Sequence, residues 1–188
     1  MRRGFTLIEL LVVVAIIGLL ASIVTVSLTS ARAKGRDARR IADIKTIEVS
    51  LRMYYTDNGM YPKNIYGSGA SAPDSGLAPT YLPRVPTDPN QSGACTGAEA
   101  ACYKYISFKS GTGSSVCNAG MPPVTYHIGA PIEDTVNTYL AQDLDTSATI
   151  SGYTACTTGV PNPTFDGNAQ GCVGTSPAAP DSCYDLRP

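Results

Sequence analysis

The sequence has few of the residues that hydrolytic enzymes and metal sites use. Its 188 residues include one histidine, His127, with no G-x-S-x-G motif, no glycine-rich phosphate-binding loop and no C-x-x-C pair. A hydrolase needs a nucleophile, a base and a group that orients the base, and zinc sites are usually built from closely spaced cysteines and histidines. We therefore predict that the chain is not an enzyme and holds no zinc. His127 is expected to be a partly exposed residue of a strand.

Charge is nearly absent from the first part of the chain. Residues 5–28 contain one ionisable side chain, Glu9, and no proline. Because about 20 apolar residues are enough for a helix to cross the hydrocarbon core of a bilayer, this run predicts a membrane-spanning helix. A carboxylate at that depth is costly, which makes Glu9 a candidate functional residue.

The remaining charges are divided unevenly along the chain. Residues 30–52 carry seven cations and three anions, a net charge of +4, whereas the residues after Met53 carry five cations and eleven anions, a net charge of −6. The acidic part is not expected to bind nucleic acid. In the basic part, Arg36, Arg39 and Arg40 are candidates for contact with anionic lipid headgroups, and a solvated helix face is the alternative.

The basic part also has the periodicity of an amphipathic helix. Apolar residues recur at spacings of three and four and share one face, whereas Arg39 and Arg40 point elsewhere; the apolar set is Ile41, Ile44, Ile47, Leu51 and Tyr54. Because no proline interrupts residues 5–56, we predict one continuous helix. Its first part, 5–30, would lie in a membrane or a filament core, and 31–56 would pack on a head. Asn58-Gly59, followed by Pro62, is the expected helix end.

Residues 57–188 are predicted to form a globular, β-rich head. Segments 102–108 and 123–130 alternate with the period of half-buried strands, and 137–144 is a weaker third candidate. Loops rich in glycine, proline and serine separate these segments. The expected fold class is α+β, with a long amino-terminal helix packed on a small antiparallel sheet whose loops are stapled by disulfides.

Cysteine is confined to the head. An even number of cysteines in one domain predicts up to three disulfides and an oxidising compartment; the six are Cys95, Cys102, Cys117, Cys156, Cys172 and Cys183. Six cysteines permit 15 pairings, so the connectivity stays open. Short loops favour Cys95 with Cys102 and Cys172 with Cys183, which leaves Cys117 with Cys156. The basic segment by itself favours a cytoplasmic head, but the cysteines favour a head outside the cytoplasm.

The first residues carry a recognisable pattern. Arg2, Arg3, Gly4, Phe5, Thr6, Leu7, Ile8 and Glu9, followed by a long apolar helix, resemble the amino-terminal signature of type IV pilins and of the pseudopilins of type II secretion systems. The resemblance is close over residues 2–31. In the head, "YYTDNGMYP", "YLPRVPTDP" and the "YKYIS" strand are similar to the major pseudopilin of type II secretion.

The resemblance implies a processing and assembly pathway. A prepilin peptidase in the membrane would remove the leader 1–4 by cutting between Gly4 and Phe5, and would methylate the new amine of Phe5. The subunit would sit in the cytoplasmic membrane with a single pass and the head outside, among membrane lipids. An inner-membrane assembly platform would then add it to a helical homopolymer, in which Glu9 pairs with the Phe5 amine of a neighbouring copy. The filament could serve a pilus, a secretion pseudopilus or DNA uptake, as a major or a minor subunit.

Two features leave alternatives open. Major pseudopilins commonly bind calcium, but Asp166 and Asn168 are only weak candidates here, as are Asp143 and Asp145, because they lack the D-x-D-x-D-G spacing; a solvated turn and no cofactor are expected. The other alternative is a secreted or membrane-anchored binding or adhesin module, with an ordinary signal cut after Ala33 or an anchor segment. It would bind through exposed aromatic residues among Tyr61, Tyr66, Tyr81 and Tyr153. Ordinary signals have apolar stretches of only about 7–15 residues.

Overall fold

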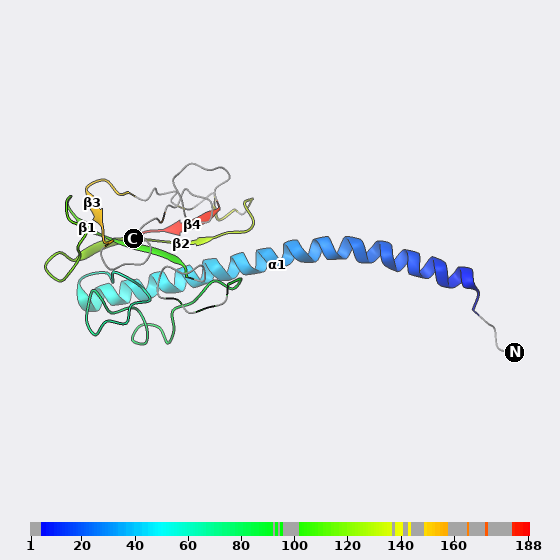
Figure 1. Cartoon of the computed structure of the whole chain (residues 1–188), viewed down its shortest axis with the longest axis horizontal. Helices are drawn as coiled ribbons and strands as arrows, with labels where there is room; N and C mark the ends of the chain where they lie inside the picture. Colours follow the sequence, from blue (N-terminus) through cyan, green and yellow to red (C-terminus); the bar gives the residue numbers. More distant parts are fainter. Residues whose placement is uncertain are drawn as a thin grey trace. The chain divides into compact units, whose positions relative to one another are not determined.

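The computed structural model of the chain describes residues 5–91, 93, 95, 102–136, 138–140, 143, 149–157, 165, 172 and 182–188. The chain divides into two compact units, Met1–Gly35 and Arg36–Pro188. The regular structure of the described residues consists of one helix, α1 (Leu7–Asn58), and a four-stranded sheet (Figure 1). The α+β fold class expected from the sequence is therefore confirmed.

Helix α1 begins and ends within two residues of the predicted range 5–56. Its end follows the expected chemistry, because Gly59 adopts a positive φ of 67° and donates its N–H to the Tyr55 carbonyl at 2.8 Å. In the first unit the apolar part of the helix is long and apolar enough to cross a membrane, and none of that part is buried within the chain.

The sheet is antiparallel throughout, with strand order β3-β1-β2-β4. Strands β1 (Lys104–Ser110) and β2 (Pro123–Pro131) correspond to the two stronger predictions. The third candidate, 137–144, is wrong for its described residues, because 138–140 form a turn and 143 lies in a bend. The outer strands are instead β3 (Tyr153–Ala155) and β4 (Cys183–Leu186), which sequence reasoning missed because three or four residues are too few for a periodic signal.

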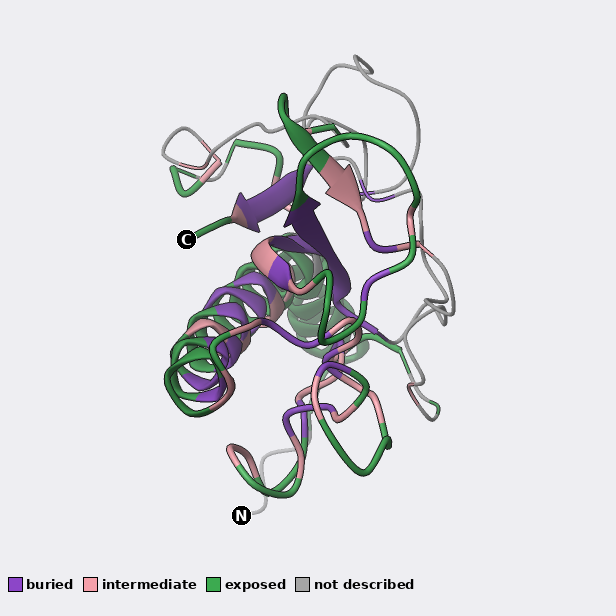
Figure 2. Ribbon diagram, turned by 90° about the vertical axis from the view of Figure 1, so that its left-hand side faces the viewer, coloured by how far each residue is buried: buried purple, intermediate pink, exposed green. Residues whose placement is uncertain are grey.

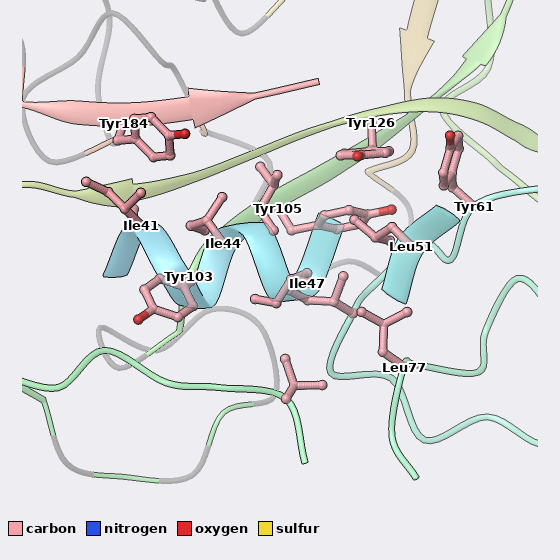
Figure 3. Close-up of a cluster of buried hydrophobic side chains, with 14 of the residues drawn as sticks. Ile41, Ile44, Ile47, Leu51, Tyr61, Leu77, Tyr103, Tyr105, Tyr126 and Tyr184 are labelled. Atoms are coloured by element: carbon pink, nitrogen blue, oxygen red, sulfur yellow. The ribbon is translucent and has the colours of Figure 1, made fainter. Parts of the chain in front are cut away.

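The main core lies between the second half of α1 and one face of the sheet (Figure 2). All five residues of the predicted helix stripe are buried, which confirms the period of the pattern. They pack with tyrosines and aliphatic residues of the strands and loops. Figure 3 shows Ile41, Ile44, Ile47 and Leu51 of the stripe together with Tyr105 and Tyr126. Each such side chain contributes about 1.5–3 kcal/mol when fully buried, so this face holds the helix on the head.

A second, smaller core cluster is formed by residues of β1 and β4 with Phe165 and a disulfide; its buried members are Ile106, Phe108, Phe165, Cys172 and Cys183. Gly129 on β2 allows the close approach of Phe165, because a Cβ at this position would lie 2.8 Å from the Phe165 ring atom Cζ. The cluster fastens the short carboxy-terminal strand to the sheet.

The structure contains two of the three expected disulfides, Cys117–Cys156 and Cys172–Cys183. The expected bond between Cys95 and Cys102 is not formed between these two described residues. Cys95 instead has a side-chain hydrogen bond with the Tyr66 hydroxyl, and Cys102 interacts with this hydroxyl only electrostatically. The same hydroxyl takes part in a hydrogen-bond chain from the Tyr103 N–H to the Pro86 carbonyl. The short sequence separation of Cys95 and Cys102 was therefore not enough to predict a disulfide between them.

Candidate assembly site

The first turn of α1 is closed by Thr6 and Glu9. Thr6 Oγ1 accepts the Glu9 N–H at 3.3 Å, and Glu9 Oε2 accepts the Thr6 N–H at 2.9 Å and the Thr6 hydroxyl at 2.7 Å. This arrangement is a capping box, which satisfies backbone N–H groups that a helix start leaves without partners. Sequence reasoning missed it, although the T-x-x-E spacing was a signal that could have found it. Glu9 is thus held in place within the single chain.

The cap occupies only part of the Glu9 carboxylate. Among the described residues, both hydrogen bonds to this side chain end on Oε2, so Oε1 is available for another donor. Phe5 lies directly before the cap and is 81% exposed. Gly4, the other residue of the predicted cleavage site, lies outside the described residues. The geometry therefore presents an exposed carboxylate oxygen and an exposed aromatic residue at the start of the helix.

The helix around this site is apolar on all sides. Leu7 is 80% exposed and Ile8 70% exposed, and large apolar residues continue to be exposed as far as Leu28. An isolated helix of this kind is not stable in water, because its apolar surface needs lipid or other helices to cover it. The apolar surface of the first unit is therefore expected to be covered by lipid or by helices of other chains.

In the second unit, a buried ion cluster surrounds Arg40. The guanidinium forms a two-point contact with Asp88, from Nε at 2.8 Å and from Nη2 at 2.9 Å, and Nη1 donates to Asp37 at 2.8 Å and to Glu133 at 2.7 Å. Asp37 also accepts the backbone N–H groups of Glu133 and Asp134 at 3.0 and 2.9 Å. The cluster thus joins the helix to two loops that are distant in sequence.

The ion cluster corrects the expected position of Arg40. Its side chain is buried rather than directed away from the head. Burial by itself lowers the pKa of Arg40, but the hydrogen bonds to Asp88 and Glu133 outweigh this effect and raise its pKa overall. The sequence could not reveal the pairing, because Arg40 and Asp88 are separated by 48 positions.

Arg36 extends the cluster toward the surface. Its Nε and Nη2 donate to the two oxygens of Glu133 at 2.8 and 2.5 Å. The hydrogen bond from Arg36, together with the hydrogen bond from Arg40 and the charges of both arginines, outweighs the effect of burial and lowers the pKa of Glu133 to about 2. Of the three arginines considered as lipid contacts, only Arg39 keeps a mostly exposed side chain, 66%, with Asp43 as a distant partner at 3.9 Å.

His127 is fully buried, so the expectation of a partly exposed strand residue is wrong. Its Nε2 contacts Asp185 Oδ2, and its ring centroid lies 4.1 Å from the ring centroid of Phe165. The strand was predicted correctly, but its half-buried character was not. Residues 126–130 of β2 are all buried, because structure from distant parts of the chain covers both faces of the strand. The His127–Asp185 pair links β2 to β4 and has no exposed surface through which a substrate could reach it.

The residues that the sequence suggested for calcium binding and for an aromatic binding surface do not form a site among the described residues. Asp166, Asn168 and Asp145 lie outside the described residues, and the residues that the structure does describe contain no group of three or more histidine, cysteine, aspartate or glutamate side chains suited to a metal ion. Of the four tyrosines considered as binding anchors, Tyr61 is buried and only Tyr153 is exposed; Tyr66 and Tyr81 are half-buried. A binding surface made of these tyrosines is therefore not present.

Comparison with known proteins agrees with the amino-terminal geometry. Residues 1–25 match the prokaryotic N-terminal methylation motif. That motif, on a long apolar helix that enters a small antiparallel head, defines the class of type IV pilins and pseudopilins. The chain belongs to this class as a member of the family of type II secretion system core protein G.

Three relatives illustrate the extent of the similarity. The Escherichia coli K12 protein is 32% identical over 134 residues, 64% of this chain and 92% of the relative. The Dickeya chrysanthemi and Vibrio cholerae proteins are 36% and 37% identical over 96 and 95 residues, 47% of this chain in both cases. The chain spans only 63% and 65% of the lengths of those two relatives. No solved structure matches the chain.

Proposed function

We propose that the chain is a structural subunit of a type II secretion pseudopilus or a closely similar filament. The observation that carries this proposal is the N-terminal methylation motif at residues 1–25, placed on a helix whose apolar part is not buried by the rest of the chain. Membership of the core protein G family supports it. A filament of such subunits would cover each apolar helix with the helices of its neighbours.

Processing precedes assembly in this proposal. A prepilin peptidase cuts between Gly4 and Phe5 and methylates the new amine of Phe5. The cut leaves the Thr6–Glu9 cap intact, because Thr6 and its N–H belong to the mature chain. The mature helix then begins with a positive amine one residue before a helix start whose own partial charge is also positive.

Assembly uses the oxygen of Glu9 that the cap leaves available. The cap holds the carboxylate at the first turn through Oε2, and Oε1 accepts a hydrogen bond from the Phe5 amine of the adjacent copy. A carboxylate at membrane depth is destabilising for a single subunit, and pairing with a cation removes part of that cost. The pair between Glu9 and the neighbouring Phe5 amine therefore favours addition of the subunit to the filament over the single subunit in the membrane. It also sets the position of each added subunit.

The head lies on the outer side of the cytoplasmic membrane before assembly, and in the filament afterwards. Two disulfides support this orientation, because such bonds persist in oxidising compartments. The assembly platform of the inner membrane is the partner that adds each subunit, and no enzymatic activity is assigned to the head.

Intact-mass spectrometry of the membrane-extracted chain tests the proposal when a prepilin peptidase is co-expressed. We expect a mature chain that begins with N-methylated Phe5, filaments by negative-stain microscopy, and a Gly4→Leu variant that stays uncut. A mature chain that begins at Lys34 would indicate an ordinary secretory signal and would favour the secreted binding module. A chain that keeps Met1 and forms no filaments would refute the proposal.

A further inference from the structure

A small pocket lies at the end of β1, beside the loop that leads into β2. Its volume is about 300 Å³, and its walls are formed by Lys109, Ser110, Gly120, Met121, Pro122 and Val124. This volume is at the lower end of the range of pockets that hold small molecules. Apart from Lys109 and Ser110, the side chains that line it are apolar.

Lys109 is one of two buried lysines on β1, and it is the one that lines the pocket. It is 7% exposed, and its Nζ has one described contact, to the Met121 sulfur at 3.4 Å. Among the residues that the structure describes, no carboxylate forms an ion pair with it, whereas the equally buried Arg40 is bound by three carboxylates. An ammonium group has three donors and a thioether is a weak acceptor, so Lys109 keeps donor capacity that the described residues do not use.

The pocket is held rigidly on both sides. On one side, the register of β1 and β2 shifts between Phe108 and Lys109, which sets Lys109 at a bulge. On the other side, Asn118 and Met121 exchange backbone hydrogen bonds at 3.2 and 3.0 Å, and Asn118 Oδ1 also accepts the Met121 N–H at 3.0 Å. Cys117, the residue before this turn, is joined to Cys156. The wall that carries Met121 is therefore fixed before any ligand arrives.

We propose that this pocket binds a carboxylate carried on a short apolar body. The carboxylate would accept hydrogen bonds from Lys109 Nζ, and the apolar body would contact Pro122 and Val124. An ammonium that is removed from water without an anion is destabilising, and the attraction to an anion is stronger beside apolar walls than in bulk water. A neutral amide of the same size lacks the charge and binds far more weakly.

The carboxylate can come from two sources. One is a free short-chain acid in solution. The other is an aspartate or glutamate side chain of a second copy, since the residues after Met53 carry eleven anions against five cations. Only the second source depends on the proposed filament, because it requires that copies lie side by side.

The first experiment uses the full, detergent-solubilised chain and the probes butyrate and butyramide. We expect butyrate to cause saturable amide shifts in ¹H–¹⁵N spectra at residues 109–110 and 120–124, and butyramide to cause none. Lys109→Met should weaken butyrate binding by about tenfold or more, since hydrogen bonds to charged groups contribute about 1.5–3 kcal/mol. Lys109→Arg, which keeps the charge, should retain binding. Lys104→Gln is the matched control, because Lys104 is also buried on β1 but does not line the pocket.

The second experiment identifies the source of the carboxylate in filaments. A water-soluble carbodiimide joins an amine and a carboxylate in contact as an amide, with loss of water, and filaments mixed from ¹⁴N- and ¹⁵N-labelled copies reveal which links join different copies. A link from Lys109 to an acidic residue of another copy supports the second copy as the source. Binding of butyrate without such a link supports a free acid.

The proposal is overturned if butyrate causes no saturable shifts and Lys109 forms no link between copies. It is also overturned if Lys109→Met, folded by its thermal midpoint and spectrum, binds butyrate as the parent chain does. If no filaments form, the proposed function fails, but the butyrate titration still decides the pocket, and absence of binding then refutes it.

Discussion

Replacing Glu9 by glutamine separates the two roles of this side chain, which are the helix cap with Thr6 and the proposed pairing with the Phe5 amine of a neighbouring copy. The structure has Glu9 capping the helix through Oε2, at 2.9 Å from the Thr6 nitrogen and 2.7 Å from its hydroxyl oxygen. Glutamine also completes capping boxes, so the side-chain carbonyl oxygen of the substituted residue should keep both contacts. Within one subunit, the change removes only the attraction between the carboxylate and the helix start, about 0.3–1 kcal/mol. Insertion and cleavage should therefore be normal.

The effect on the filament should be much larger. If Glu9 pairs with the Phe5 amine of a neighbour, the variant leaves that cation in an apolar environment without its anion. Removing one partner of a buried ion pair costs about 3–5 kcal/mol, which corresponds to a loss of about a hundredfold to several thousandfold in the equilibrium constant of each joint. Because a helical filament repeats the same contact at every step, the loss recurs along its whole length.

The assay compares three chains that are expressed alone as the only pilin-like subunit: the parent, Glu9→Gln and Thr6→Ala. Membrane insertion and the mature mass are checked first, and filaments are then counted by negative-stain microscopy. Thr6→Ala is the matched control, since it removes the cap hydroxyl at a cost of about 1 kcal/mol but keeps the charge, so filaments should persist. Abundant filaments of Glu9→Gln would refute the pairing with Phe5.

Three further predictions concern the head. Arg40→Met should destabilise it by about 3–5 kcal/mol in urea unfolding, because Asp37 and Asp88 lose their buried cation, whereas Arg39→Met, which is exposed, should change stability by less than about 0.5 kcal/mol; equal effects would contradict the assigned cluster. The folded-state pKa of Glu133, about 2, lies below its unfolded value of about 4.3. The ionised Glu133 therefore contributes its full stabilisation of the head above about pH 4.3, and this stabilisation is lost as the pH falls toward 2. The thermal midpoint of the parent head should therefore fall more than that of Glu133→Gln between these pH values, and parallel curves would argue against the ion pairs of Glu133 with Arg36 and Arg40. Removing the Cys117–Cys156 disulfide by a double alanine change should lower stability by about 2–4 kcal/mol, measured by urea unfolding without reductant, and an unchanged midpoint would show that the bond does not restrain the unfolded chain.

The sequence predicted the helix and the two central strands because their signals are local and repeated. The spacing of three and four from Ile41 to Tyr54 requires no knowledge of the rest of the chain, and every member is buried. The Asn58-Gly59 end and the strand-forming residues of β1 and β2 are local signals in the same sense, although both strands are more fully buried than the alternation predicted. The amino-terminal motif is likewise a short contiguous pattern, which is why the family could be recognised from residues 2–31.

The tertiary structure alone decided which distant side chains meet. Arg40 contacts Asp88 and Glu133 across 48 and 93 positions, and His127 contacts Asp185 across 58. None of these pairs has a periodic or contiguous signature, so sequence reasoning placed Arg40 on an exposed face and His127 at a half-exposed strand position. The pairing of cysteines was only partly accessible for the same reason.

By itself, the sequence determined that one long helix begins with the N-terminal methylation motif and continues into a disulfide-containing head, because residues a few positions apart specify a helix and its apolar face. Only the folded head decided that Arg40 and His127 are buried, that β3 and β4 complete the sheet, and that Lys109 lines a pocket without a carboxylate partner among the described residues. The physical reason is that burial and charge pairing depend on loops that close over many residues, and their final positions follow from the packing of the whole head rather than from any short segment.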